Sequence, residues 1–129
     1  MKLLIDTTDT DKLRLEVSDD KGKRLVKTTV SAFRKQGEKL LPSLDRLLKR
    51  KSWQLSDIKA ITVVNGQGSF SGLRIGIATA NALAYILGVS VVDDQGNCLK
   101  TDDLNIVEPY YTAEPNIGGN KPVDNQKNI

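Results

Sequence analysis

The stretch from Ile58 to Gly88, IKAITVVNGQGSFSGLRIGIATANALAYILG, decides the fold of this 129-residue chain. Its first part, Ile58–Val64, is mostly apolar and rich in β-branched residues, which is typical of a buried parallel strand. A glycine loop, Gly66–Gly72, leads into an apolar run over Gly72–Leu87 that predicts a helix with Gly88 as its C-cap. Strand, glycine loop and helix form a βα unit, so we expect a sheet that contains parallel strands.

One side of this predicted helix carries a row of small residues. The row repeats at a spacing of four: Gly72, Gly76, Ala80 and Ala84. A helix side without long side chains lets a neighbouring element approach closely. The row therefore suits packing on this chain's own sheet or on a partner helix, and both faces of the helix can be used at once.

The residues before this unit predict three strands and a first helix. Strands are expected over Lys2–Asp6, Lys12–Ser18 and Lys23–Val30, joined as an antiparallel meander with Gly22 at positive φ in the second turn. The helix is expected over Gln36–Arg50, where five leucines form an apolar stripe: Leu40, Leu41, Leu44, Leu47 and Leu48. Pro42 predicts either a kink or a helix start near Gly37–Glu38.

A fifth strand over Ser90–Val92 completes the order β-β-β-α-β-α-β. This order predicts an α/β fold with a five-stranded mixed sheet, in which the first, fourth and fifth strands are parallel. We expect the lobe over residues 1–94 and a linker with a residual terminal strand over residues 95–113. The anchors there are Leu104–Val107 and Tyr110–Tyr111, and residues 114–129, rich in Pro, Gly and Asn, are expected to be a disordered tail.

The composition excludes several kinds of catalytic site. The chain has no histidine and one cysteine, which rules out a Ser-His-Asp triad, a His-ligated metal, a zinc cluster and an internal disulfide. Cys98 lies in a polar segment without a histidine partner and is expected to be a bystander. We therefore expect no catalytic residue and no metal site. Few apolar residues precede Asp6, so we also expect no signal peptide, no membrane segment and a cytoplasmic location.

Positive charge is concentrated in the first half of the chain. The net charge is +3 with a pI of about 9.0, and residues 1–60 hold 15 basic and 9 acidic side chains. Much of this charge lies between Arg34 and Lys51. Such a segment attracts nucleic acid or an acidic protein, or it is simply a solvated helix face. Six aromatic residues, none inside the cluster, do not predict a platform for stacking single-stranded bases.

Polar residues at the ends of the predicted parallel strands form a candidate phosphate-binding site: Asp6, Thr7, Thr8, Gly66, Gly68 and Ser69. Backbone N–H groups of the glycine loop and a helix N-terminus, capped by Ser69 or Ser71, attract anions. The loop is neither a P-loop nor a GxGxxG motif, and a tight structural turn explains it equally well. Asp6 also suggests a shared Mg²⁺ site with Asp93 and Asp94, whereas Asx turns at separated strand ends explain the same acids.

Three segments resemble one known family. Ile61–Ala80, ITVVNGQGSFSGLRIGIATA, closely resembles the signature GxGPGSFTGLRIGxAxAxGLA of the TsaB/YeaZ family, glycoprotease-like subunits of bacterial tRNA threonylcarbamoyladenosine (t6A) synthesis. Leu3–Thr8, LLIDTT, resembles the family's opening LAIDTS. Glu38–Leu44, EKLLPSL, resembles its SExLLPxI helix start, which accounts for Pro42. The resemblance covers residues 1–94 well and residues 107–111, VEPYY, weakly.

The sequence also departs from the family pattern. Gln36–Gly37 stand where the family has His-Ser, Gln67 replaces a proline, and Thr112 replaces an arginine. Family members carry a second α/β subdomain after the fifth strand, for which this chain has almost no room. The resemblance therefore implies a minimal form that lacks this subdomain.

The resemblance implies a ribonuclease-H-like lobe of the actin/sugar-kinase/Hsp70 superfamily and a non-catalytic role. Such a subunit docks on a TsaD-like catalytic subunit through its two helices and supports threonylcarbamoyl transfer to adenosine 37 of tRNA. The implied partners include a TsaE-like ATPase, tRNA bound indirectly through the complex, and a second copy when the chain is free. No cofactor is implied beyond weak nucleotide binding shared with partners. The implied interface residues are Leu40, Leu44, Leu47, Gly72, Arg74, Gly76, Ala80 and Leu83.

Two other functions remain open from the sequence. A nucleotide- or phosphate-binding lobe of an actin-like enzyme would bind Mg²⁺-nucleotide as an isolated chain. A small basic tRNA-binding domain would bind tRNA with an affinity that falls steeply with salt.

Overall fold

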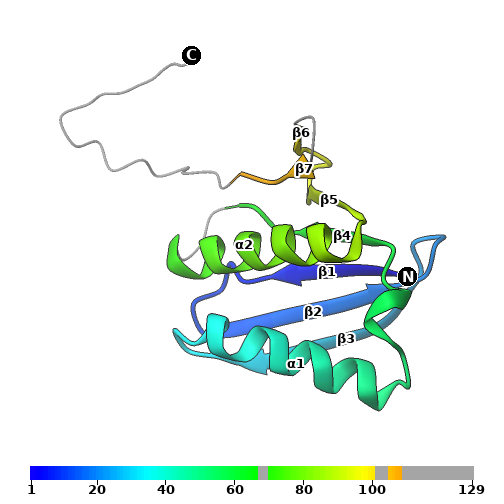
Figure 1. Cartoon of the computed structure of the whole chain (residues 1–129). Helices are drawn as coiled ribbons and strands as arrows, with labels where there is room; N and C mark the ends of the chain where they lie inside the picture. The colour runs from blue at the N-terminus through cyan, green and yellow to red at the C-terminus, as the bar shows by residue number, and fades with distance from the viewer. Residues whose placement is uncertain (67–69, 101–104, 109–129) are drawn as a thin grey trace.

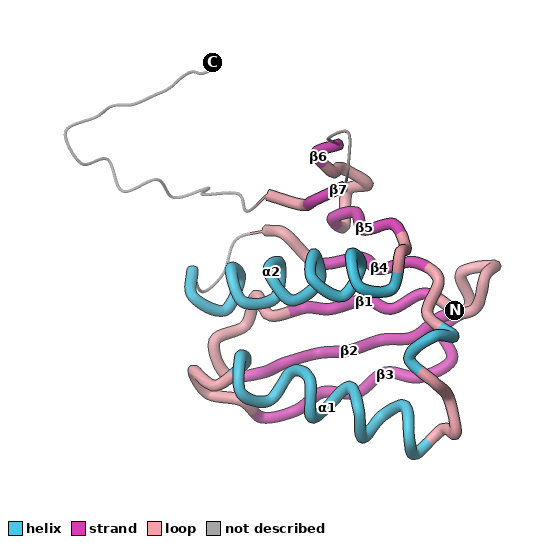
Figure 2. The backbone as a smooth tube through the Cα atoms, viewed as in Figure 1, coloured by secondary structure: helices cyan, strands magenta, loops and turns pink. Residues whose placement is uncertain are grey.

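The computed structural model describes residues 1–66, 70–100 and 105–108, and it has two layers. A five-stranded mixed sheet in the order β3-β2-β1-β4-β5 forms one layer. Helices α1 and α2 form the other, and both lie on the same face of the sheet (Figures 1 and 2). The predicted sheet and element order are confirmed.

The first half of the sheet is the antiparallel meander. It consists of β1 (Lys2–Asp6), β2 (Lys12–Ser18) and β3 (Arg24–Ser31). Gly22 has a φ of +88° in the β2–β3 turn, as predicted, and nothing lies near its missing side chain. Period-two alternation turns Leu13, Leu15 and Val17 of β2 toward the helices, where they are fully buried.

The second half of the sheet is parallel. Strand β4 (Ala60–Val63) pairs in parallel with β1, and β5 (Ser90–Asp93) pairs in parallel with β4. The predicted fourth strand over Ile58–Val64 is too long, because the short 3₁₀ helix η1 (Leu55–Asp57) precedes it and Ile58 still has its cap geometry. Ile58 is nevertheless buried in the core.

Helix α1 (Gln36–Arg50) lies over β2 and the edge strand β3 (Figure 1). Pro42 lies inside the helix without ending it. Its ring cannot donate the hydrogen bond that the Glu38 carbonyl would accept. Both Pro42 and Glu38 are exposed, so water can satisfy that carbonyl.

Helix α2 (Phe70–Leu87) lies over β1, β4 and β5 and ends, as predicted, at Gly88, whose φ is +69°. The core between helices and sheet includes Leu3 and Ile5 of β1, Leu73 and Ile77 of α2, and Val91 of β5. Packing in this core holds both helices against the sheet. The candidate site lies at the strand ends of this sheet.

A small antiparallel hairpin, β6 (Leu99–Lys100) and β7 (Asn105–Ile106), follows β5. Of the expected anchors, Val107 is buried, and the Asn81 side chain of α2 hydrogen-bonds both its N–H and its carbonyl. Leu104, Tyr110 and Tyr111 lie outside the described residues, as does the tail expected over residues 114–129.

Candidate functional site

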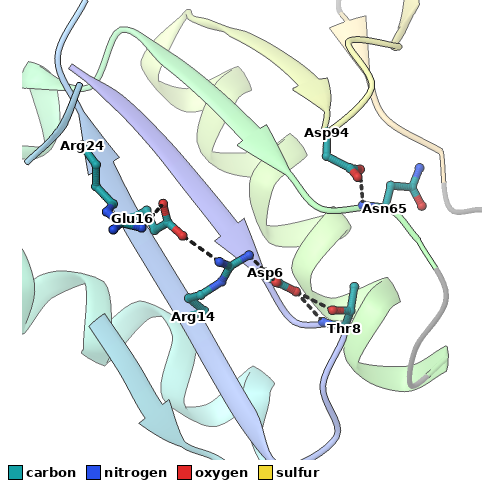
Figure 3. A network of polar contacts seen from close by, with 7 residues as sticks. All are labelled: Asp6, Thr8, Arg14, Glu16, Arg24, Asn65 and Asp94. Atoms are coloured by element: carbon teal, nitrogen blue, oxygen red, sulfur yellow. Dashed lines mark hydrogen bonds and ion pairs between the residues drawn. The ribbon is translucent and has the colours of Figure 1, made fainter. Parts of the chain in front are cut away.

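The end of β1 carries a carboxylate whose two oxygens are both engaged. Asp6 Oδ1 accepts hydrogen bonds from the Thr8 N–H at 2.9 Å and the Thr8 hydroxyl at 2.6 Å. Its Oδ2 accepts a bond from Arg14 Nη2 at 2.7 Å. Figure 3 shows this cluster at the end of β1. These bonds occupy three of the about four lone-pair positions that the carboxylate offers to donors or to a cation.

The cluster continues across β2 toward β3. Arg14 also donates to Glu16 Oε2 at 2.8 Å, and Arg24 lies 3.7 Å from Glu16 Oε1. Burial alone would raise the pKa of Asp6, but the hydrogen bonds from Thr8 and Arg14 outweigh it and hold the pKa below its ordinary value. Asp6 is therefore ionised at neutral pH and poorly suited to act as a general acid.

Thr7 ties the end of β1 to the start of α2. Its side chain is fully buried, and its hydroxyl donates to the Gly72 carbonyl at 2.6 Å. A methyl group on Gly72 would lie 2.8 Å from the Thr7 carbonyl oxygen, and one on Gly76 would collide with the Thr7 hydroxyl. Gly72 and Gly76 of the small-residue row thus pack against this chain's own strand end.

The acids at the end of β5 lie in turns. Asp93 Oδ1 accepts from the N–H groups of Gln95 and Asn97, and Asp94 Oδ1 accepts from the Asn65 N–H at 2.8 Å. Within residues 1–66, 70–100 and 105–108, no three acidic or cysteine side chains gather as a metal site would require. Of the two interpretations, the geometry supports Asx turns over a shared Mg²⁺ site for these acids.

The candidate phosphate-binding residues lie only partly within the described chain. Asp6, Thr7 and Thr8 lie together at the end of β1, where their side chains bond to one another or to α2. Gly66 is half-buried after β4, with open space around it. Gly68 and Ser69 lie outside the described residues, so phosphate binding stays a prediction.

The predicted interface residues are mostly interior. Leu40, Leu44 and Leu47 of α1 are at most 2% exposed, and Leu83 and Ala80 of α2 are also buried. Gly72 and Gly76 are buried as well, whereas Arg74 is exposed. In the isolated chain most of these side chains already make contacts within the fold, so their role as a docking surface stays a prediction.

A groove between the helices reaches the surface instead. This helix groove has a cavity volume of about 360 Å³ and is lined by Leu41, Leu44, Asp45, Leu48, Lys49, Trp53, Gln54, Leu55 and Leu83. Leu41 on its rim is 51% exposed. Two of the predicted interface residues, Leu44 and Leu83, contribute to its lining.

The outward side of α2 is also largely apolar, with Arg74 as its one charged residue. We call it the α2 outer stripe: Ile75, Ala78, Ala82, Tyr85 and Ile86. Tyr85 and Ile86 are 71% and 72% exposed, and Ile75 lies beside Gly37 of α1. Large apolar side chains that gather at an exposed surface mark sites of protein–protein contact.

Sequence reasoning missed these exposed residues, although a signal existed. Helix α2 has one charged residue, Arg74, in its 18 residues. A helix that is apolar on all sides is normally covered on all sides. The small-residue row identifies one side of α2, and the opposite, exposed side was not considered. Gln36 was also missed: it is buried and donates to the carbonyls of Asp9 and Thr10, holding the β1–β2 turn against α1.

Comparisons with known proteins agree with this fold. Residues 30–93 match the TsaD family, described as tRNA N6-adenosine threonylcarbamoyltransferase. The solved structure of YeaZ from Pseudomonas aeruginosa superposes with a TM-score of 0.64 at 27% identity, over 71% of this chain and 42% of YeaZ. The TsaB protein of Escherichia coli K12 is 36% identical over 64 residues, 46% of this chain and 28% of TsaB. The chain is thus similar to the TsaB/YeaZ proteins in both sequence and fold.

The match extends to the catalytic relatives of TsaB/YeaZ proteins. A tRNA N6-adenosine threonylcarbamoyltransferase of Geotalea uraniireducens is 37% identical over 60 residues, 46% of this chain and 18% of the enzyme. This chain thus spans less than a third of the curated relatives' length. The YeaZ superposition confirms the expected family fold. No helix in the described part of the chain has the length and apolar character needed to cross a membrane.

Proposed function

We propose that this chain acts in t6A synthesis as a non-catalytic, TsaB-like subunit that docks on a TsaD-like catalytic subunit. The observation that carries the proposal is the apolar surface formed by the helix groove and the α2 outer stripe. It lies on the two helices through which the family resemblance implies docking. It includes two of the predicted interface residues, Leu44 and Leu83, and adds exposed side chains that the sequence did not single out.

A non-catalytic role is supported by the state of the polar residues. The chain has no histidine, and the carboxylate at the end of β1 is held ionised by Thr8 and Arg14. General acid–base catalysis needs a group whose pKa lies near the working pH. The partner is therefore expected to supply the chemistry.

The test is capture of a TsaD-like subunit from the same organism, measured as a dissociation constant by calorimetry. Ile86→Asp and Tyr85→Asp place a charge in the apolar stripe. Each is expected to weaken binding at least tenfold, because exposed aromatic and aliphatic anchors carry most interface energy. Melting temperature should change little, since both side chains are more than two-thirds exposed.

Leu25→Asp is the matched control. Leu25 is an exposed apolar residue on β3, away from both helices, with 40% of its surface accessible. This variant should bind like the parent chain. Equal affinity of the Ile86→Asp, Tyr85→Asp and parent proteins would refute the proposed surface.

Other partners are proposed to bind at the same surface or at the strand ends. A second copy would cover the α2 outer stripe when no TsaD-like subunit is present, and a TsaE-like ATPase would join the assembled complex. Weak nucleotide binding at Asp6–Thr8 is the alternative function of an actin-like lobe. It is supported less well, because the hydroxyls of Thr7 and Thr8 already donate within the chain.

A further inference from the structure

The side of α1 that faces away from α2 carries three cations in a line. We call these residues, Lys39, Arg46 and Arg50, the basic stripe. Their spacing of seven and four places them on one side of the helix, about 16 Å from end to end. The Lys39 ammonium donates to the Ser31 carbonyl and Arg50 Nη2 to the Thr28 hydroxyl, both at 3.2 Å on β3. The stripe therefore follows the edge strand.

The charge of this stripe is not neutralised. The hydrogen-bond acceptors that hold it are a carbonyl and hydroxyls, with Arg46 Nη2 lying 3.4 Å from the Ser43 hydroxyl. These acceptors restrict the side chains without cancelling their charge. The ion pair that α1 does form, Lys49–Asp45, uses neither of the two arginines nor Lys39. Across the described residues, no carboxylate lies within ion-pair distance of the three cations.

An exposed aromatic residue lies near one end of the stripe. Phe33 follows β3 two residues after Ser31, the residue that Lys39 contacts, and is 60% exposed. The Arg34 guanidinium lies over its ring, 5.3 Å from the centroid. Exposed rings beside arginines offer a face for an unstacked base, and arginines match phosphate oxygens in geometry.

We propose that the basic stripe, together with Phe33 and Arg34, is an RNA-binding surface that contacts the phosphate backbone of tRNA directly. Phosphate recognition by the arginines and stacking on Phe33 favour RNA over an acidic protein, which has no bases to stack. The stripe lies on the opposite side of α1 from the helix groove, so RNA and a protein partner can be bound together. Only the choice of tRNA among RNAs rests on the proposed function.

The test uses the full chain and a fluorescently labelled, unmodified tRNA transcript. Binding is followed by anisotropy over a series of salt concentrations. The triple variant Lys39→Gln, Arg46→Gln, Arg50→Gln should bind at least tenfold more weakly at about 0.1 M salt. Its slope of log affinity against log salt should be shallower by about 2, since each lost phosphate contact removes about 0.7 from that slope.

A charge-matched control separates a local surface from net charge. Lys2→Gln, Lys21→Gln, Lys59→Gln removes the same charge from three exposed lysines that lie outside α1. This control should bind tRNA within about twofold of the parent protein. Phe33→Ala should lower the affinity at every salt concentration without changing the slope, because stacking releases no counterions.

Three outcomes would overturn the proposal: no tRNA binding by the parent chain, equal losses in the two triple variants, or stronger competition by polyglutamate than by unlabelled tRNA. Capture of the TsaD-like subunit is measured with the same proteins. The stripe variant should keep that capture, whereas Ile86→Asp should lose it and still bind tRNA. Each proposal can therefore fail without the other.

Discussion

Helices α1 and α2 lie side by side on one face of the sheet, yet they differ in what they bury and expose. Helix α1 buries leucines and exposes charges, whereas α2 buries a row of glycine and alanine beside Leu73 and Ile77 and exposes Tyr85 and Ile86. The difference arises beneath α2, where Thr7 leaves no room for a side chain. A helix whose inner side has no room for large side chains at some positions can still carry them on its outer side.

This contrast separates residues that hold the fold from residues available to a partner. On α1 the leucine pattern identifies the inner side and the charges the outer side. On α2 the glycines and alanines of the small-residue row are inner, and two of the largest apolar residues, Tyr85 and Ile86, are outer. If large apolar residues are taken as inner on both helices, the exposed Tyr85 and Ile86 of α2 are wrongly assigned to the core.

The largest effect is expected from filling the contact between α2 and β1. Gly76→Leu would force its side chain into the buried Thr7 hydroxyl, and overpacking of this kind should lower the free energy of unfolding by about 3 kcal/mol. Urea denaturation measures it. Ala78→Leu, on the exposed side of the same helix, should change stability by less than about 0.5 kcal/mol. Similar losses in both variants would show that the small-residue row is not the inner side.

A somewhat smaller effect separates two neighbouring leucines of α1. Leu44→Ala removes a buried side chain and should cost about 2.5 kcal/mol, near the lower end of the range for such cavities. Leu41→Ala removes one that is half exposed and should cost little stability while weakening partner capture. Thermal and urea unfolding of both variants give the comparison. A larger stability loss in Leu41→Ala would reverse the assigned inner side of α1.

The smallest effect concerns the strand end on which α2 rests. Because the pKa of Asp6 is lowered in the folded chain, its ionised form stabilises the fold above the ordinary value of 3.8, and this contribution is lost as the pH falls below it. Asp6→Asn should cost about 1 kcal/mol at pH 7. Unfolding free energies from pH 7 down to pH 3 should converge for the two proteins at the acid end. If the unfolding free energies of the two proteins differed by the same amount at every pH, the charge of the Asp6 carboxylate would not contribute to stability.

Much of the fold followed from local patterns in the sequence. The alternation in Lys12–Ser18, the leucine spacing in Gln36–Arg50 and the glycines at 22 and 88 each predict an element that the structure contains. The parallel pairing of β1, β4 and β5 follows from the βα unit. These features depend on neighbours in sequence or on general rules of chain connection.

The surface that a partner would use was not predictable in the same way. Whether Gly76 faces a partner or its own sheet depends on Thr7, which lies 69 positions away in the sequence. Tyr85 and Ile86 look like core residues until the opposite side of α2 is known to be filled. The hydrogen bonds that occupy Asp6 likewise come from β2 and from the chain after β1, and residue types alone do not reveal them.

The Asn81 side chain of α2 holds the chain that follows β5 at Val107. Its amide accepts from the Val107 N–H at 2.9 Å and donates to the Val107 carbonyl at 3.0 Å, as a neighbouring strand would. The Asn65 side chain, after β4, likewise donates to the carbonyl of the next residue, Glu108. Bonds from two elements that precede the connection after Asp94 thus hold Val107 and Glu108, so we expect an insertion into that connection to leave these bonds in place.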